Sequence, residues 1–239
     1  MKYKRIILKL SGEALASKDG VHIYDKTVLS NIHSQVSELL KQGLEVAIVV
    51  GGGNIWRGAG SAKIDLILED ADYMGMMATS INAKALESFF TLKNLPVSNY
   101  NSLEFESIAP KVDAIKADLD LKAGKVVIFG GGTGKPFLST DTAAAMRAID
   151  IKAEVILMAK NGVDGVYTSD PKKNADARHI PELTFDDVIQ QNLQVVDKEA
   201  MQLLKGKNID ILLFNMNQDN SIIGIFNNES QNKTIIKDN

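Results

Sequence analysis

Apolar residues gather along the chain in short continuous runs, separated by longer segments that suit helices. Continuous runs of this kind are expected of parallel strands that are buried on both faces. They predict strands over residues 5–10, 44–50, 125–129, 154–158 and 209–214, and residues 96–100 are a further, shorter strand candidate. Between them, helices are predicted over residues 28–40, 70–92, 109–122 and 142–149. Gly43 follows the first helix at the position where a residue with positive φ commonly ends one.

Strands and helices alternate along most of the chain, which is typical of the α/β class. We therefore expect a three-layer αβα sandwich, in which helices cover both faces of a mainly parallel central sheet. Two segments fall outside this pattern. Residues 161–181 have no clear period and are rich in Gly, Asp, Asn, Lys and Pro, so we expect a functional loop there. Ile235 and Ile236 stand in an otherwise polar tail and predict an edge strand.

The composition is that of an ordinary globular protein, and it narrows the classes of function. The 239 residues are 45% hydrophobic and suit one large domain. Cysteine is absent, which excludes disulfides and thiolate metal sites, and the three histidines show no metal-ligand spacing. The net charge is −3 without a basic stripe, so we expect no nucleic acid partner. No apolar run suits a membrane span or a signal peptide, so we expect a cytoplasmic protein without a membrane partner.

Three glycine-bearing turns follow three of the predicted strands. Their sequences are SGEA at residues 11–14, GGGNIWRGAG at residues 51–60 and GGGTGKPF at residues 130–137. The carboxyl ends of parallel strands lie at one edge of a sheet, where ligands bind, and the free N–H groups of glycine turns bind anions. Three such turns favour a phosphate-rich ligand over plain turn chemistry.

The standard phosphate fingerprints are nevertheless absent from these turns. In the third turn Phe129 stands where a Walker A loop needs its first glycine, and Pro136 stands where it needs Ser or Thr. The second turn lacks the last glycine of the dinucleotide pattern. The sequence therefore argues against both a P-loop nucleotidase and a dinucleotide-binding dehydrogenase.

Four charged residues near the turns are candidates for the site, and each also has an ordinary structural explanation. Lys9 interrupts an apolar strand near its carboxyl end, so it either faces an anion or reaches solvent from an edge strand. Arg57 is either a clamp on phosphate oxygens or a surface residue. Asp72 either accepts hydrogen bonds from a ribose diol or is a solvated helix carboxylate. Asp141, at the start of a predicted helix, either caps it or orients Mg²⁺ or a lysine.

Several longer runs resemble the bacterial UMP kinases, which belong to the amino-acid-kinase superfamily. The runs are KLSGEAL at 9–15, GGGNIWRGAG at 51–60, DYMGMMAT at 72–79, GGTGKPFLSTDTAAA at 131–145, VDGVYTSDP at 163–171 and FNM at 214–216. They occur in the order of that family and cover nearly the whole chain, although KLSG and VDGVYTSDP alone would indicate only the superfamily. The resemblance implies a nucleoside monophosphate kinase that transfers the γ-phosphoryl group of ATP to UMP.

The resemblance also implies which residues form the site. Lys9, Arg57 and Asp141 would be the catalytic residues. The residues implied for ATP are Lys9, Leu10, Ser11, Gly12, Gly53, Arg57, Asn161, Tyr167 and Asp170. The residues implied for UMP are Gly52, Asp72, Thr133, Gly134, Lys135, Pro136, Phe137, Leu138, Ser139 and Thr140.

Further properties follow from the same resemblance. It implies one amino-acid-kinase domain over residues 1–239, with the acceptor bound roughly by 1–150 and ATP roughly by 151–239. It implies a homohexamer and a Mg²⁺ cofactor that is held mainly by phosphates and water, with no direct protein ligand. Several members respond to GTP and UTP, but the loop that corresponds to a region implicated in the GTP response, Ser17 to His22, is variable in the family, so it gives no basis for predicting regulation.

A phosphate acceptor explains why no glycine turn carries a histidine or another evident base. The second pKa of a phosphate monoester is about 6, so its oxygen is already ionised at neutral pH. What remains is positioning and charge neutralisation. Two other functions stay open: a superfamily kinase acting on a carboxylate or carbamate, and a nucleotide-binding sensor or storage protein without turnover. The runs at 72–79 and 132–137 favour the nucleotide acceptor.

Overall fold

The fold is seen in a computed structural model of the chain. It describes residues 2–57, 65–160, 162, 164–169, 171, 173–174, 176–191, 193, 196–216, 220–226 and 233–238. Among the described helices, none combines the length and the apolar character that a membrane span requires.

Within the described residues, eight strands form one sheet in the order β3-β4-β2-β1-β5-β9-β10-β8. These strands are β1 (Arg5–Leu10), β2 (Glu45–Val50), β3 (Val97–Asn101), β4 (Val126–Gly130), β5 (Val155–Lys160), β8 (Glu182–Thr184), β9 (Asp210–Asn215) and β10 (Lys233–Lys237). Neighbouring strands are parallel throughout, apart from the antiparallel pair β9–β10. The mainly parallel sheet is therefore confirmed. A separate two-stranded ribbon pairs β6 (Val166–Tyr167) with β7 (His179–Ile180).

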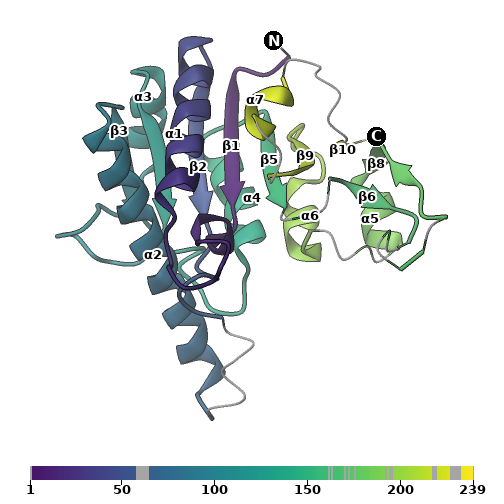
Figure 1. Cartoon of the computed structure of the whole chain (residues 1–239), viewed down its shortest axis with the longest axis horizontal. Coiled ribbons are helices and arrows are strands. Elements are labelled where there is room, and N and C mark those ends of the chain that lie inside the picture. The colour runs from purple at the N-terminus through teal and green to yellow at the C-terminus, as the bar shows by residue number, and fades with distance from the viewer. Residues whose placement is uncertain are drawn as a thin grey trace.

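Helices cover both faces of the sheet, which confirms the three-layer sandwich (Figure 1). One face carries α1 (Lys26–Lys41), α2 (Leu68–Leu92) and α7 (Ser221–Gly224). The other carries α3 (Ala114–Lys122), α4 (Thr140–Asp150), α5 (Phe185–Gln190) and α6 (Lys198–Leu204). A 3₁₀ turn, η1 (Gly12–Leu15), follows β1 directly.

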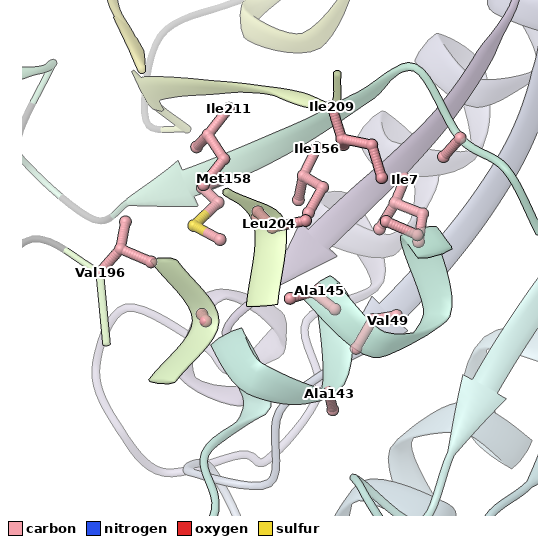
Figure 2. Packing of buried hydrophobic residues seen from close by; sticks show 14 of the residues in the cluster. Ile7, Val49, Ala143, Ala145, Ile156, Met158, Val196, Leu204, Ile209 and Ile211 are labelled. Carbon is pink, nitrogen blue, oxygen red and sulfur yellow. The ribbon is translucent and has the colours of Figure 1, made fainter. Parts of the chain in front are cut away.

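The two-residue alternation of strand side chains divides the core into two layers. In β1, Ile6 and Leu8 pack beneath α1 and α2, whereas Ile7 packs beneath α4 and α6. Figure 2 shows the second layer, where Ile7, Ile156 and Ile211 from three adjacent strands point toward the two helices. The same alternation decides the face to which a polar residue at a strand end points.

Two predicted elements differ from the observed ones. The helix expected over 109–122 begins only at Ala114, because Asp113 caps it and the preceding backbone pairs with β3 instead: Val112 N donates to Asn101 O at 3.0 Å. The strand containing Ile235 and Ile236 exists, but the expectation that it is an edge strand is wrong. It lies between β9 and the three-residue strand β8, which forms the edge.

Short elements in the carboxyl-terminal third were not predicted at all. They are the ribbon β6–β7 inside the expected loop, and then β8, α5, α6 and the four-residue helix α7. Helices of six and seven residues are too short to show a clear period in the sequence, and their burial comes from packing against α4 and each other.

Candidate active site

Two of the glycine turns pack backbone to backbone at the carboxyl ends of β1 and β2. A Cβ atom added to Gly12 would lie 2.6 Å from the nitrogen of Gly53 and 2.8 Å from the oxygen of Gly51. Neither turn uses positive φ at these positions. Glycine is needed here because of close approach rather than backbone conformation.

The third turn, after β4, uses glycine for its conformation. Gly131, Gly132 and Gly134 have φ values of 76°, 56° and 77°. The N–H of Gly131 donates to Thr79 Oγ1 of α2 at 2.8 Å. The second turn packs on the same helix, because a Cβ atom on Gly52 would lie 2.8 Å from the oxygen of Gly75. Helix α2 therefore joins the second and third turns, and the structure brings all three turns to one edge of the sheet, as the strand order predicts.

Lys9 and Asp141 form a buried ion pair at this edge. Lys9 Nζ lies 2.6 Å from Asp141 Oδ1, and the two residues are each 8% exposed. Strand β1 is paired on both sides, with β2 and β5, so the edge-strand explanation of Lys9 is wrong. The helix-cap explanation of Asp141 is also wrong, because the hydroxyl of Ser139 caps α4 by accepting from Asp141 N at 3.0 Å.

The charge of this pair is set by its surroundings. Burial acts to raise the pKa of the Asp141 carboxyl, but the ammonium groups of Lys9 and Lys160 outweigh burial and hold this pKa below its usual value. Asp141 is therefore ionised at neutral pH and cannot act as a general base of ordinary strength. The arrangement is suited to holding a lysine in place for an anionic ligand.

Arg57 is held loosely, at the surface of the same edge. Its Nη2 lies 2.9 Å from Glu13 Oε1, with the two side chains 69% and 40% exposed. An exposed ion pair contributes little stability, so Arg57 can exchange Glu13 for a stronger anion. The structure thus brings Arg57 to the first two turns, next to Gly53, whose oxygen accepts from Arg57 Nε at 3.4 Å.

Asp72 reaches from α2 to the third turn. Its Oδ2 accepts from the N–H of Phe137 at 2.7 Å, and Phe137 has a positive φ of 65°. Asp72 is therefore not simply a solvated helix carboxylate, because it fixes the segment that runs from Thr133 to the start of α4. Within that segment, Thr133 Oγ1 donates to Lys135 O and accepts from Lys135 N.

Comparison with known proteins agrees with this geometry. The sequence model of the Amino acid kinase family matches residues 4–215. A uridylate kinase from Mycoplasmopsis synoviae is 45% identical over 224 residues, which cover 93% of this chain and 94% of that protein. The chain belongs to the uridylate kinases of the amino acid kinase family.

Other members of the family are similarly close. A uridylate kinase from Mycoplasmopsis pulmonis is 45% identical over 92% of this chain and 91% of its own length. The crystal structure of UMP kinase from Ureaplasma parvum superposes with a TM-score of 0.93, at 37% identity over 99% of this chain and 100% of that one. The UMP kinase structure from Bacillus anthracis gives a TM-score of 0.94 at 37% identity, over 100% and 98% of the two chains.

The residues that the family resemblance implies for adenosine are placed only in part. Tyr167 lies on β6, where its hydroxyl donates to Asp164 Oδ1 at 2.7 Å and its ring meets that of His179 edge-on. Asn161 and Asp170 lie outside the described residues. Leu10 ends β1, and Ser11 caps η1 by accepting from Ala14 N.

The described residues contain no group of three histidine, cysteine, aspartate or glutamate side chains that could hold a metal ion. Asp141 lies in the site, but its two oxygens already face two lysines. A Mg²⁺ ion that arrived with nucleotide phosphates would meet there a carboxylate that two ammonium groups already neutralise.

One supporting residue escaped the sequence reasoning. Asn82 of α2 is fully buried, and its amide donates to Gly51 O at 2.7 Å and to Asn54 Oδ1 at 2.7 Å. Its oxygen accepts from Tyr24 Oη at 2.9 Å. An asparagine within a long helix gives no clear signal in a sequence, and Thr79 and Ser80 close to it on the buried face of α2 are polar as well.

We expect Asn82→Ala to lower the free energy of unfolding by about 2–3 kcal/mol, since the carbonyl of Gly51 loses its buried partner and a small cavity remains. Urea unfolding measures this change, with an unaltered m-value. Ser34→Ala, on the exposed side of α1, is the control and should change stability by less than about 0.5 kcal/mol. Equal effects of the two changes would show that Asn82 does not hold the second turn.

Proposed function

We propose that the chain is a UMP kinase, which transfers the γ-phosphoryl group of Mg-ATP to UMP and releases UDP and ADP, as a step of pyrimidine nucleotide biosynthesis. The observation that carries the proposal is the buried Lys9–Asp141 pair, which lies where three glycine turns meet. The uridylate kinases that match over nearly the whole chain support UMP as the acceptor.

The reaction needs no protein base. An ionised phosphate oxygen of UMP attacks the γ-phosphorus, the bond from that phosphorus to the β–γ bridging oxygen breaks, and its electron pair leaves on ADP. No proton has to move, because the attacking oxygen is already deprotonated near neutral pH. This agrees with the absence of histidine from all three turns.

Three kinds of group would stabilise the charge that moves during transfer. Lys9, fixed by Asp141, would bind phosphate oxygens from within the site, and Arg57 would close on them from the surface. The backbone N–H groups of the glycine turns would supply further donors. Mg²⁺ bound to ATP would neutralise phosphate charge. Phosphate oxygens and water molecules, rather than protein side chains, would be the ligands of the ion.

The chain would divide its ligands between two parts. Residues roughly 1–150 would hold the acceptor, with Gly52, Asp72 and the segment Thr133–Thr140 around UMP. Residues roughly 151–239 would hold the adenosine half of ATP, with Asn161, Tyr167 and Asp170. Leu10, Ser11, Gly12 and Gly53 would line the phosphates between them. The contact between Asp72 and Phe137 supports the acceptor part, since it joins α2 to that segment.

We expect Asp72→Asn to raise KM for UMP about tenfold, because a neutral amide accepts a ribose hydrogen bond about 1.4 kcal/mol more weakly than a carboxylate does. KM for ATP should change by less than about twofold. Steady-state kinetics with each substrate varied in turn measure both values. Asp70→Asn, on the exposed first turn of the same helix, is the control and should alter neither. Equal effects of Asp72→Asn on both substrates, or none, would make Asp72 a purely structural residue.

One assay separates the proposed function from its two rivals. Purified protein with Mg-ATP is offered UMP, CMP, AMP, GMP and amino-acid acceptors, and ADP release is followed. Release with UMP alone supports the proposal. Release of ADP with a carboxylate or carbamate acceptor would show another kinase of the superfamily. If none of the acceptors led to ADP release, the protein would be a sensor or storage protein.

We also propose that the enzyme works in the cytoplasm as a homohexamer, as its family resemblance implies. An apolar stripe on α2 supports association with further copies: Tyr73, Met77 and Ile81 are 37%, 42% and 52% exposed. Met77 and Ile81 line a hollow of about 530 Å³ together with Tyr24, Phe105 and Ile108. Exposed apolar surface of this kind marks contact sites. Sedimentation velocity tests the proposal, and a monomer at micromolar concentration would contradict it.

A further inference from the structure

The carboxyl end of β5 places a second lysine beside the Lys9–Asp141 pair. Ile156 and Met158 of β5 belong to the core layer beneath α4 and α6, and Lys160 stands two residues further along the strand. Because strand side chains alternate, Lys160 points to that same face. Lys9 stands two residues beyond Ile7 of β1 and shares the face for the same reason. Strands β1 and β5 are parallel neighbours, so the two lysines emerge at one edge.

Asp141 lies between the two lysines and offers one carboxylate oxygen to each. Lys9 Nζ lies 2.6 Å from Oδ1, and Lys160 Nζ lies 3.6 Å from Oδ2. The carboxylate thus holds both ammonium groups around one point of the site. Lys160 is the looser and more exposed of the two, with 29% of its side chain accessible against 10% for Lys9.

The surroundings of Lys160 disfavour its charge more than Asp141 favours it. Burial lowers the pKa of Lys160, and the ammonium of Lys9 lowers it further, while Asp141 and Asp197 act in the opposite direction without restoring the usual value. Burial and repulsion from Asp141 raise the pKa of Asp197, at the start of α6, and no ion pair between Asp197 and either lysine is found among the described residues. The two ammonium groups therefore share the carboxylate of Asp141, and neither is fully occupied by it when an anionic ligand enters.

We propose that Lys160 is a further catalytic residue, whose ammonium group binds the oxygens of the phosphoryl group while it passes from ATP to the acceptor. An ammonium group has three donors, and an acceptor at 3.6 Å satisfies at most one of them weakly. The remaining donors are available to phosphate oxygens at the open edge. Lys160 transfers no proton. The acceptor oxygen forms the new bond to the γ-phosphorus, and the bond from that phosphorus to the β–γ bridging oxygen breaks, with its electron pair leaving on ADP. This inference rests on the proposed phosphoryl transfer.

The alternative is that Lys160 only neutralises Asp141 and so stabilises the fold. The two roles make different predictions for the transition state. Loss of a structural lysine would weaken the binding of the ground state and of the transition state alike. Loss of a lysine that binds the moving phosphoryl group would weaken mainly the binding of the transition state.

The test compares two variants. Lys160→Met keeps the approximate length of the side chain but removes its charge, and Lys160→Arg keeps the charge. We expect Lys160→Met to lower kcat for UMP phosphorylation roughly 100-fold, the effect of removing one charge-stabilising donor. Lys160→Arg should recover at least about tenfold of that loss, since the guanidinium retains the charge but not the geometry. Calorimetry should show that Mg-ADP affinity changes by less than about threefold, while the affinity for Mg-ADP with aluminium fluoride and UMP, a mimic of the transition state, falls roughly 100-fold.

The control is Lys125→Met. Lys125 is also a partly exposed lysine in an ion pair, with Asp120 at 2.8 Å, but it precedes β4 at the opposite edge of the sheet. It should leave kcat and both affinities unchanged. Near-normal kcat in Lys160→Met, or equal losses of the two affinities, would overturn the role of Lys160 and leave the kinase assignment intact. A wild-type protein that turns over no acceptor would overturn both.

Discussion

Lys9→Met should reduce kcat for UMP phosphorylation by about 10³-fold, at the upper end of what one preorganised donor supplies to a developing charge. Lys9 is the innermost cation of the site, since its side chain is 10% exposed and its partner Asp141 is equally buried. A methionine fills the same space but presents no charge to the phosphates. Single-turnover measurement of ADP formation reports the loss in the chemical step.

The same change should affect folding much less than catalysis. Breaking a buried ion pair typically costs about 3–5 kcal/mol, but Asp141 keeps Lys160 at 3.6 Å as a second partner, so we expect a smaller loss. Thermal unfolding of the variant measures it. A variant with near-normal kcat would remove Lys9 from the mechanism.

Arg5→Met is the matched control for Lys9, because it removes a buried cation from the other end of the same strand. Arg5 is bound by Glu45 at 2.5 Å and by Asp118 at 2.8 Å, at the edge of the sheet remote from the glycine turns. We expect this change to lower the unfolding temperature while kcat per folded molecule stays the same. A comparable fall in kcat for both variants would mean that activity responds to any loss of a buried charge in β1.

Gly12→Ala should reduce kcat/KM for ATP by about 100-fold, because the first two glycine turns can no longer touch. The new methyl group would lie 2.5 Å from Asn54 Oδ1 and 2.6 Å from the backbone nitrogen of Gly53. Backbone atoms cannot yield as a flexible side chain does, so the turns must separate. Displacement of a site by about 1 Å is enough for a loss of this size.

Gly43→Ala provides the comparison for Gly12→Ala. Gly43 has a φ of 85° and open space around it, at the end of α1 and outside the turns. Alanine there should lower the free energy of unfolding by about 1 kcal/mol through backbone strain alone, with kcat/KM unchanged. If both variants retained full activity, close contact between the two turns would not matter for nucleotide binding.

Much of the fold follows from local patterns. Continuous apolar runs predict β1, β2, β4, β5 and β9, because residues buried on both faces have to be largely apolar. Strand β3, with the sequence VSNYN, gives a weaker signal. The failures have physical causes as well. Residues 109–112 are free to pair with β3, and Asp113 then starts the helix later than predicted. The strand around Ile236 is flanked by polar residues in the sequence, which suggested an edge strand. Strand β8 nevertheless pairs with its outer side, and no local pattern reveals this pairing.

The site was predictable as far as it depends on strand ends. Lys9 and the three glycine turns are visible because each interrupts or follows an apolar run. Lys160 was open to the same reasoning, since it ends the run VILMAK, but the predicted strand stopped at Met158. Asn82 gave no comparable signal, because its partners, Gly51 and Tyr24, lie on distant segments.

The sequence by itself determined the α/β class, the glycine turns at one edge of the sheet and, through its resemblance to the bacterial UMP kinases, the acceptor. These depend on hydrophobic periodicity, on turn chemistry and on motifs, all of which are local along the chain. Only the tertiary structure decided that β1 is an inner strand, that Asp141 faces Lys9 rather than capping its helix, and that Lys160 shares this carboxylate. The physical reason is that the charge balance of a buried group depends on which strands and helices become its neighbours.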